Sequence, residues 1–336
     1  MATIKDVARR AGVGIGTVSR VITGRGIVSA KTAKKVHRII DELAYRPSRT
    51  ARRLQAGMSH TIGVFLPVIH GAFYTPMLHA IYKALWEHEL HMVVAFGKSP
   101  DDERQQAIEG VRFLTDHGCD GLLIMATALK LADVVSLTAV APRIALLNRY
   151  FPSYAEACFI PDHKKAGAVA AQALWQAGHR RVAVIEGPDY SKDNAARMRG
   201  FYKTMAACGV DIDGIPVFRG DFAPSGGWAG AQSLLSGKKK FSALFCANDE
   251  MALGAISYLH HIGVSVPGDI SVLGYDGLDV ATYAAPPLTT VRMPWTELAL
   301  SAVNFLLNQC YEFTLPVERN QQATLVWRDS VAKIGR

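Results

Sequence analysis

The first twenty residues, Met1-Ala-Thr-Ile-Lys-Asp-Val-Ala-Arg-Arg-Ala-Gly-Val-Gly-Ile-Gly-Thr-Val-Ser-Arg20, decide how the N-terminal part of the chain folds. Apolar residues recur at positions 4, 7, 8 and 11, which is the spacing of one face of a helix. Thr3 is suited to cap the start of this helix, with Asp6 completing a capping box, and Gly12 to end it. A second apolar face, at positions 18, 21 and 22, follows after a short turn. The stretch therefore predicts a helix-turn-helix, whose second helix can enter a DNA major groove.

Positive charge is concentrated around this stretch. Residues 1–60 contain 13 Lys and Arg against 3 Asp and Glu, whereas residues 61–336 contain 24 against 26. Any small three-helix domain can show the same apolar spacing, but a local basic excess is typical of a protein that contacts the phosphate backbone of DNA. The glycines at 12, 14 and 16 superficially resemble a dinucleotide-binding fingerprint. We exclude that interpretation because no strand precedes them and the third glycine is misplaced.

The segment Thr3-Ile-Lys-Asp-Val-Ala-Arg-Arg-Ala-Gly-Val, followed by Thr17-Val-Ser-Arg-Val-Ile and later by Tyr45-Arg-Pro, resembles the lac-repressor (LacI/GalR) family of bacterial transcription regulators. The similarity extends through residue 330. It implies an all-α helix-turn-helix headpiece in residues 1–46 and a hinge helix in 47–58 that orders on operator DNA. It also implies a core in 59–336 that binds an effector and dimerises.

Two residues depart from the family pattern. Gly14 replaces the usual serine at the start of the recognition helix, and Gly16 stands where many members carry a base-reading side chain. The expected base readers are therefore Ile15, against a thymine methyl group, and Arg20, against guanine O6 and N7. The DNA-binding set as a whole is Thr3, Ile15, Gly16, Thr17, Ser19, Arg20, Thr32, Tyr45, Arg52, Leu54 and Gln55.

The predicted hinge carries one large apolar residue, Leu54, among arginines. A leucine inserted into the minor groove can unstack a base step and bend the duplex, and Leu54 matches the intercalating leucine of the family. The alternative interpretation is that residues 47–58 form only a flexible basic linker.

From Thr61 onward, short apolar runs alternate with helical stretches, which predicts an α/β core with two doubly wound parallel sheets. The family resemblance implies two lobes of the type I periplasmic-binding-protein kind, between which the chain crosses three times. We expect the N-lobe at about 60–160 and 289–320, and the C-lobe at about 162–288 and 322–333. The main strand-like runs are 61–68, 90–96, 121–126, 143–148, 181–187, 216–222, 243–248 and 270–276.

Polar and aromatic residues follow these strands, at the edge where open parallel sheets bind ligands. Each one alone could instead cap a turn or fill the core. Together they suit a sugar, because carboxylates accept hydrogen bonds from adjacent hydroxyls and aromatic rings cover the apolar face of a pyranose. The resemblance makes Arg197 and Asp276 the main effector anchors. The full expected set is Phe73, Tyr74, Asn148, Asp193, Arg197, Phe222, Asn248 and Asp276.

The sequence thus predicts a cytoplasmic, homodimeric transcription regulator that represses a carbohydrate-utilisation operon. Its expected partners are palindromic operator DNA and a small sugar-like effector held between the lobes. Asn148-Arg149 and Asp162-His163-Lys164 most resemble the galactose and β-glucoside branch of the family, which favours a hexose or glycoside. The alternative is a regulator whose corepressor is a purine or a phosphorylated metabolite.

Other classes of protein lack support in the sequence. We find no catalytic motif, no phosphate-binding loop and no Cys or His spacing typical of a metal site, so we expect no enzyme activity, no cofactor and no metal. A periplasmic sugar receptor would share the two lobes but would need a signal peptide and no basic headpiece. No apolar run approaches eighteen residues, so we expect no membrane partner.

Overall fold

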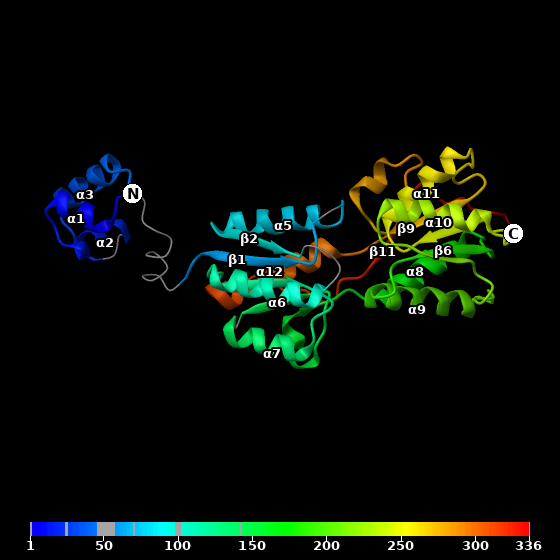
Figure 1. The fold of residues 1–336 in the computed structure, drawn as a ribbon, viewed down its shortest axis with the longest axis horizontal. Coiled ribbons are helices and arrows are strands. Elements are labelled where there is room, and N and C mark those ends of the chain that lie inside the picture. The colour runs from blue at the N-terminus through cyan, green and yellow to red at the C-terminus, as the bar shows by residue number, and fades with distance from the viewer. Residues whose placement is uncertain are drawn as a thin grey trace. The chain divides into compact units, whose positions relative to one another are not determined.

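The structure is a computed structural model that describes residues 2–23, 26–45, 58–69, 71–97, 102–141 and 143–335. The chain divides into two compact units, Met1–Ser59 and His60–Arg336 (Figure 1). Arg52, Leu54 and Gln55, which we expect in a hinge helix, lie outside the described residues.

The first unit contains three helices, α1 (Ile4–Ala11), α2 (Ile15–Thr23) and α3 (Ala30–Glu42). The predicted capping box is present: the Thr3 backbone N–H donates to the Asp6 carboxylate at 2.9 Å, and the Asp6 N–H donates to the Thr3 hydroxyl at 3.4 Å. Gly12 ends α1 with φ of 67°. The predicted helix-turn-helix is thus confirmed. Its small core consists of Val7, Ala8, Ala11, Val18, Val36, Ile39 and Tyr45.

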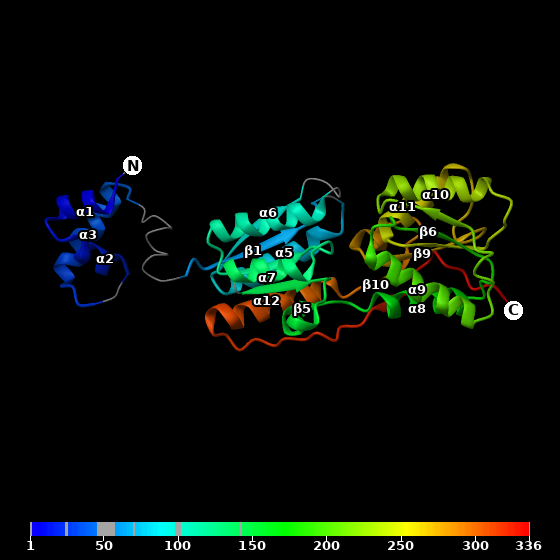
Figure 2. The ribbon, with the colours of Figure 1, turned by 60° about the horizontal axis from the view of Figure 1, so that its bottom comes forward.

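The N-lobe of the second unit has a five-stranded parallel sheet with strand order β2-β1-β3-β4-β5. Helices α5 (Tyr74–Glu87) and α12 (Trp295–Tyr311) pack on one face, and α6 (Glu103–Asp116) and α7 (Leu131–Val140) on the other (Figure 1, Figure 2). Both faces are covered, so the strands are almost continuously apolar. They are β1 (Thr61–Leu66), β2 (His91–Phe96), β3 (Gly121–Met125), β4 (Ile144–Leu147) and β5 (Cys158–Phe159).

The C-lobe has a six-stranded sheet with order β11-β10-β9-β8-β6-β7, parallel except for the antiparallel pair β10 and β11. Helices α8 (His163–Gln176) and α9 (Lys192–Ala207) pack against each other, as do α10 (Pro224–Ser236) and α11 (Asp249–His261). The strands are β6 (Val182–Glu186), β7 (Val217–Arg219), β8 (Ala243–Cys246), β9 (Ser271–Asp276), β10 (Thr289–Arg292) and β11 (Thr324–Val326).

The position of β10 corrects one predicted boundary. We expected the N-lobe to resume at residue 289, but Thr289–Arg292 pairs with β9 and belongs to the C-lobe sheet. Thr289, Thr290 and Val291 are fully buried, because β10 lies between β9 and β11. The chain returns to the N-lobe only after this strand, with α12, and crosses a third time before β11.

Two glycines allow α8 and α9 to approach until their backbones touch. A Cβ atom at Gly167 would overlap the Arg197 carbonyl oxygen, and one at Gly200 would overlap the carbonyl oxygen of Lys164. This close packing brings the start of α8, at His163, near Arg197 on α9. Across the ranges given above, every helix is too short or too polar to cross a lipid bilayer.

Candidate functional sites

A cavity of about 230 Å³ lies between the N-lobe and the C-lobe and is lined by side chains from both. It sits beyond the carboxyl ends of the strands, where parallel sheets place ligands. All eight residues of the expected effector set line it: Phe73, Tyr74 and Asn148 from the N-lobe, and Asp193, Arg197, Phe222, Asn248 and Asp276 from the C-lobe.

Three of these residues hold a left-handed backbone conformation that side chains other than glycine rarely adopt. Asn148 has φ of 62°, Phe222 of 67° and Asp276 of 107°. Each stands at or just beyond the end of a strand. Such conformations cost about 1–3 kcal/mol each and persist only where the surrounding packing maintains them. They cluster at functional sites. All three side chains line the cavity.

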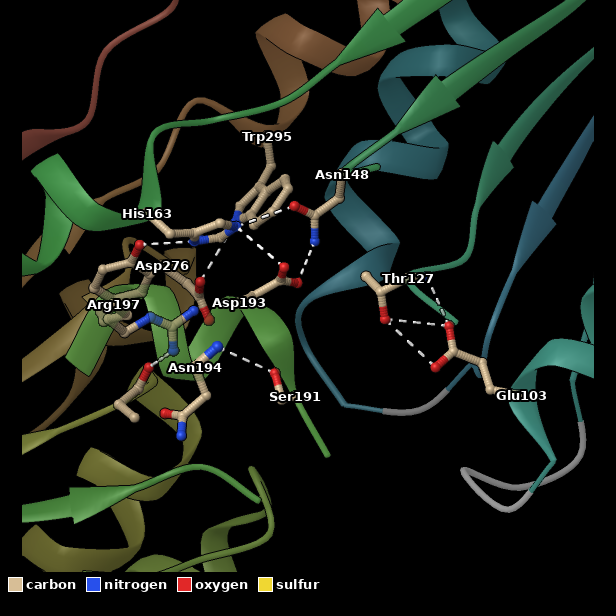
Figure 3. A network of polar contacts seen from close by, with 12 residues as sticks. Glu103, Thr127, Asn148, His163, Ser191, Asp193, Asn194, Arg197, Asp276 and Trp295 are labelled. Carbon is tan, nitrogen blue, oxygen red and sulfur yellow. Dashed lines mark hydrogen bonds and ion pairs between the residues drawn. The ribbon is translucent and has the colours of Figure 1, made fainter. Parts of the chain in front are cut away.

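A chain of polar contacts joins the two lobes at the cavity wall (Figure 3). His163 Nε2 lies 3.0 Å from Asn148 Oδ1, and His163 Nδ1 lies 3.1 Å from the Tyr275 hydroxyl. The Asn148 amide in turn donates to the Asp193 carboxylate. Since Asn148 Oδ1 can only accept, Nε2 of His163 carries the proton and Nδ1 accepts from Tyr275. The chain thus fixes the orientation of both the amide and the carboxylate.

Burial keeps His163 neutral. Its side chain is 7% exposed, and removal from water, with a smaller contribution from the nearby Arg197 charge, lowers its pKa to about 3. His163 is absent from the expected effector set, although it lies within the segment Asp162-His163-Lys164 that resembles the galactose and β-glucoside branch. Its place at the first residue of α8, directly after the first crossing between the lobes, is what brings it to the cavity.

Arg197 and Asp276 lie in the interior of the site. Arg197 is 4% exposed, its guanidinium carbon lies 3.7 Å from the Tyr275 ring centroid, and one terminal nitrogen donates to the Ala247 carbonyl. Its Nε has no hydrogen-bond partner among the described residues. Asp276 accepts from Trp295 Nε1 at 3.3 Å, and burial raises its pKa to about 7 while Arg197 acts in the opposite direction. Both groups therefore keep hydrogen-bonding capacity for a ligand.

Asn248 lines the cavity but both polar atoms of its side chain already have protein partners. Its amide nitrogen donates to the Phe222 carbonyl at 2.8 Å, and its oxygen accepts from the Met251 N–H at 3.0 Å, which caps α11. The next residue, Asp249, is fully buried and accepts from Thr290 and from the Leu278 N–H. These contacts hold the backbone beneath Phe222 and Asp276.

Several lining residues were not predicted from the sequence, and some of them lie in the first turns of helices. Glu103 begins α6 and accepts from the Thr127 N–H at 2.8 Å. Glu250 lies in the first turn of α11, and its carboxylate accepts from the Ala72 N–H of the N-lobe at 2.7 Å. The residues missed are Glu103, Thr127, His163, Tyr190, Ser191, Asp221, Glu250 and Trp295, together with Pro67, Val68 and Met125.

In the first unit, α2 presents a short row of expected DNA-binding residues to solvent. Ile15 is 45% exposed, and Gly16 and Arg20 are also exposed, whereas Thr17 and Ser19 are half-buried. Thr3 and Thr32 lie at the starts of α1 and α3, where the Thr3 hydroxyl contacts Asp6 and the Thr32 hydroxyl contacts Ser29. Tyr45 is buried in the core of this unit, so its ring is not presented to DNA in this structure.

Two family models match the chain. Residues 3–48 match "Bacterial regulatory proteins, lacI family", and residues 171–331 match "Periplasmic binding protein-like domain". The HTH-type transcriptional regulator GalR of Escherichia coli (strain K12) is 33% identical over 333 residues, which cover 99% of this chain and 96% of that protein.

Solved structures agree with these matches. A lac repressor dimer bound to operator and an anti-inducer is 27% identical with a TM-score of 0.84, covering 98% of this chain and 99% of that one. A complex of the transcriptional regulator CelR with cellobiose is 30% identical with a TM-score of 0.68, covering 98% and 100%.

Proposed function

Since the chain belongs to the lacI family of bacterial regulatory proteins and is a DNA-binding transcriptional regulator, we propose that it represses an operon for carbohydrate use in response to a small sugar held between its two lobes. The effector would be a hexose or a glycoside. Binding would favour one relative orientation of the lobes, and the affinity for operator DNA would change by as much as the ligand discriminates between orientations.

One observation carries the effector part of this proposal: side chains from both lobes converge on a single cavity between them. Asp193 and Asp276 supply acceptors for sugar hydroxyls, Arg197 supplies a donor, and the rings of Phe73 and Trp295, which meet edge to face at 5.3 Å, supply an apolar wall. The cellobiose complex of the relative CelR supports a carbohydrate as the ligand class.

The DNA part rests on the basic first unit and its exposed α2 row. The operator complex of the lac repressor dimer supports binding of two copies of this chain to one operator. The two-fold symmetry of such a dimer would match a palindromic site. The chain would act in the cytoplasm, where the chromosome is accessible. Ile15 and Arg20 would read bases, and the residues of the expected hinge, Arg52, Leu54 and Gln55, would contact the minor groove.

The test combines a screen with a binding assay. Sugars and glycosides are screened against the full chain for a rise in melting temperature, since a ligand that binds only the folded state stabilises it. The operator is located by footprinting on the DNA upstream of the chain's own gene. A sugar that raises the melting temperature should also change operator affinity, and Arg197→Ala should remove both effects. Failure of every sugar to act in either assay would overturn the assigned ligand class.

A further inference from the structure

We propose that the cavity selects against anions, so that its effector carries no phosphate or carboxylate group and a protonated amine is accepted in place of a hydroxyl. This inference rests on the proposed function for the identity of the site, and it decides between the sugar and the phosphorylated metabolite that the sequence left as alternatives. It is carried by the charges and hydrogen-bond partners of the groups that line the cavity.

Carboxylates greatly outnumber cations at the cavity wall. Among the described lining residues, Arg197 is the single cation, because His163 is held as a neutral imidazole between Tyr275 and Asn148. The N-lobe contributes one of these acids and the C-lobe contributes four. The five carboxylates are Glu103, Asp193, Asp221, Glu250 and Asp276.

In the part of the chain that the structure describes, the hydrogen-bond donors to these carboxyl groups are neutral groups, not cations. The donors are backbone N–H groups for Glu103, Asp221 and Glu250, an asparagine amide for Asp193 and an indole N–H for Asp276. Such bonds stabilise and orient an ionised carboxylate but leave its field intact. Burial is the main cause that raises the pKa of Asp276, Arg197 opposes it, and the charges of Glu250 and Asp193 raise this pKa further.

Arg197 is partly engaged by the protein, although its Nε has no hydrogen-bond partner among the described residues. It donates to the Ala247 carbonyl, lies over the Tyr275 ring, and its charge lowers the pKa of both Asp193 and Asp276. A phosphate group, with a charge of about −1.5 to −2 at neutral pH, would lose its hydration shell and meet one guanidinium and several carboxylates. Hydroxyls and ammonium groups instead bring the donors that an acceptor-rich wall requires.

The test uses matched sets of probes with the full chain: glucose, glucosamine and glucose 6-phosphate, the galactose equivalents, and ribose with ribose 5-phosphate. Dissociation constants come from calorimetry at constant ionic strength. For any sugar that binds, we expect its phosphate ester to bind at least about 100-fold more weakly, and its amine to bind within about tenfold. An ester that binds as tightly as its parent, or within about tenfold of it, would overturn the inference.

A charge-neutralised variant provides the second measurement. Glu103→Gln combined with Asp221→Asn removes two negative charges at nearly constant shape. The ratio of the dissociation constant of the phosphate ester to that of the sugar should therefore fall by about tenfold. The control, Glu109→Gln combined with Asp213→Asn, neutralises two exposed acids that do not line the cavity. It should leave the ratio of the two dissociation constants unchanged. If the two double variants give the same ratio of dissociation constants, the weaker binding of the phosphate ester does not have an electrostatic origin.

Inorganic phosphate separates failure of this inference from failure of the proposed function. Saturable phosphate binding that Arg197→Ala abolishes would overturn the inference even if no sugar binds. If neither phosphate nor any sugar or sugar ester binds, the exclusion of anions stands and the carbohydrate effector is wrong.

Discussion

His163 Nε2 lies 3.0 Å from Asn148 Oδ1, and this hydrogen bond joins the first residue of α8 in the C-lobe to the end of β4 in the N-lobe. The Asn148 amide also donates to Asp193, which belongs to the C-lobe. A neutral, buried imidazole thus orients an amide, and the amide orients a carboxylate at the cavity. The relative position of the lobes is therefore coupled to the side chains that would bind the effector.

The first prediction concerns that coupling. His163→Leu removes the hydrogen bonds of the imidazole to Asn148 Oδ1 and to the Tyr275 hydroxyl, so effector affinity should fall by about tenfold or more. His163→Gln offers one donor and one acceptor on a similar stem and should stay within about threefold of the natural protein. Calorimetric titration with the effector measures both. Equal affinity of the leucine and glutamine variants would show that His163 acts only by filling space.

The second prediction concerns pH. Burial raises the pKa of Asp276 to about 7, so its carboxyl is mostly protonated at pH 6 and mostly ionised at pH 8 in the empty site. Sugar hydroxyls donate to the ionised form, and effector affinity should therefore rise roughly tenfold between pH 6 and pH 8, with proton release on binding below pH 7.

Asp276→Asn serves as the control for this pH dependence. The variant keeps the shape of the side chain but cannot ionise, and a hydrogen bond to a charged group is worth about 1.5–3 kcal/mol. Operator binding should be nearly unchanged, the effector response should require roughly tenfold more ligand, and the pH profile should be flat. A variant that retains the full pH profile would assign the titration to another group.

The parallel strands were predictable because each is a short apolar run that both faces of a sheet bury. Parallel sheets also collect ligand-binding residues at one edge, which is why residues as distant as Phe73 and Asp276 could be expected together. The sheet that β10 joins was not predictable, because the four residues Thr289–Arg292 carry no information about which strand they will pair with. Glu103 and Glu250 escaped attention because acidic residues are ordinary in the first turn of a helix.

The role of His163 could not be predicted from the sequence either. A histidine in the sequence near a strand end is equally compatible with exposure to solvent. Its role depends on the close approach of α8 and α9 at Gly167 and Gly200 and on Asn148 from the other lobe, which are contacts between segments far apart in the chain.

The third prediction separates the two units. Residues 60–336 form a compact unit with their own core and contain the whole cavity wall, whereas the basic excess lies in 1–60. A fragment that starts at residue 60 should bind the effector with unchanged affinity and have no specific affinity for operator DNA. Calorimetry and gel-shift assays measure the two properties. For the intact chain, operator affinity should fall steeply with salt as several counterions are released. Specific operator binding by the fragment would show that the core contains DNA contacts.

The fourth prediction concerns a second contact between the lobes, formed by Ala72 and the cavity-lining Glu250. The Ala72 N–H donates to the Glu250 carboxylate at 2.7 Å, and the preceding Gly71 has φ of 71°. A Cβ atom at Gly71 would overlap the Glu250 carboxylate. Gly71→Ala should therefore displace the Glu250 carboxylate, break its hydrogen bond with the Ala72 N–H, and weaken effector binding by about tenfold or more.

Gly71→Ala combines backbone strain at a positive φ with overlap between the new methyl group and Glu250. Gly263 is a control position that has a similar φ but no such overlap. Gly263 has φ of 75°, but a Cβ atom there meets nothing within 4 Å. Both alanine variants should lose about 1 kcal/mol of unfolding free energy, because alanine disfavours a positive φ. Only Gly71→Ala should also lose effector affinity, since only there does the methyl group displace a carboxylate that links the lobes. If chemical denaturation and calorimetry give the same losses for both variants, the Ala72–Glu250 contact has no part in effector binding.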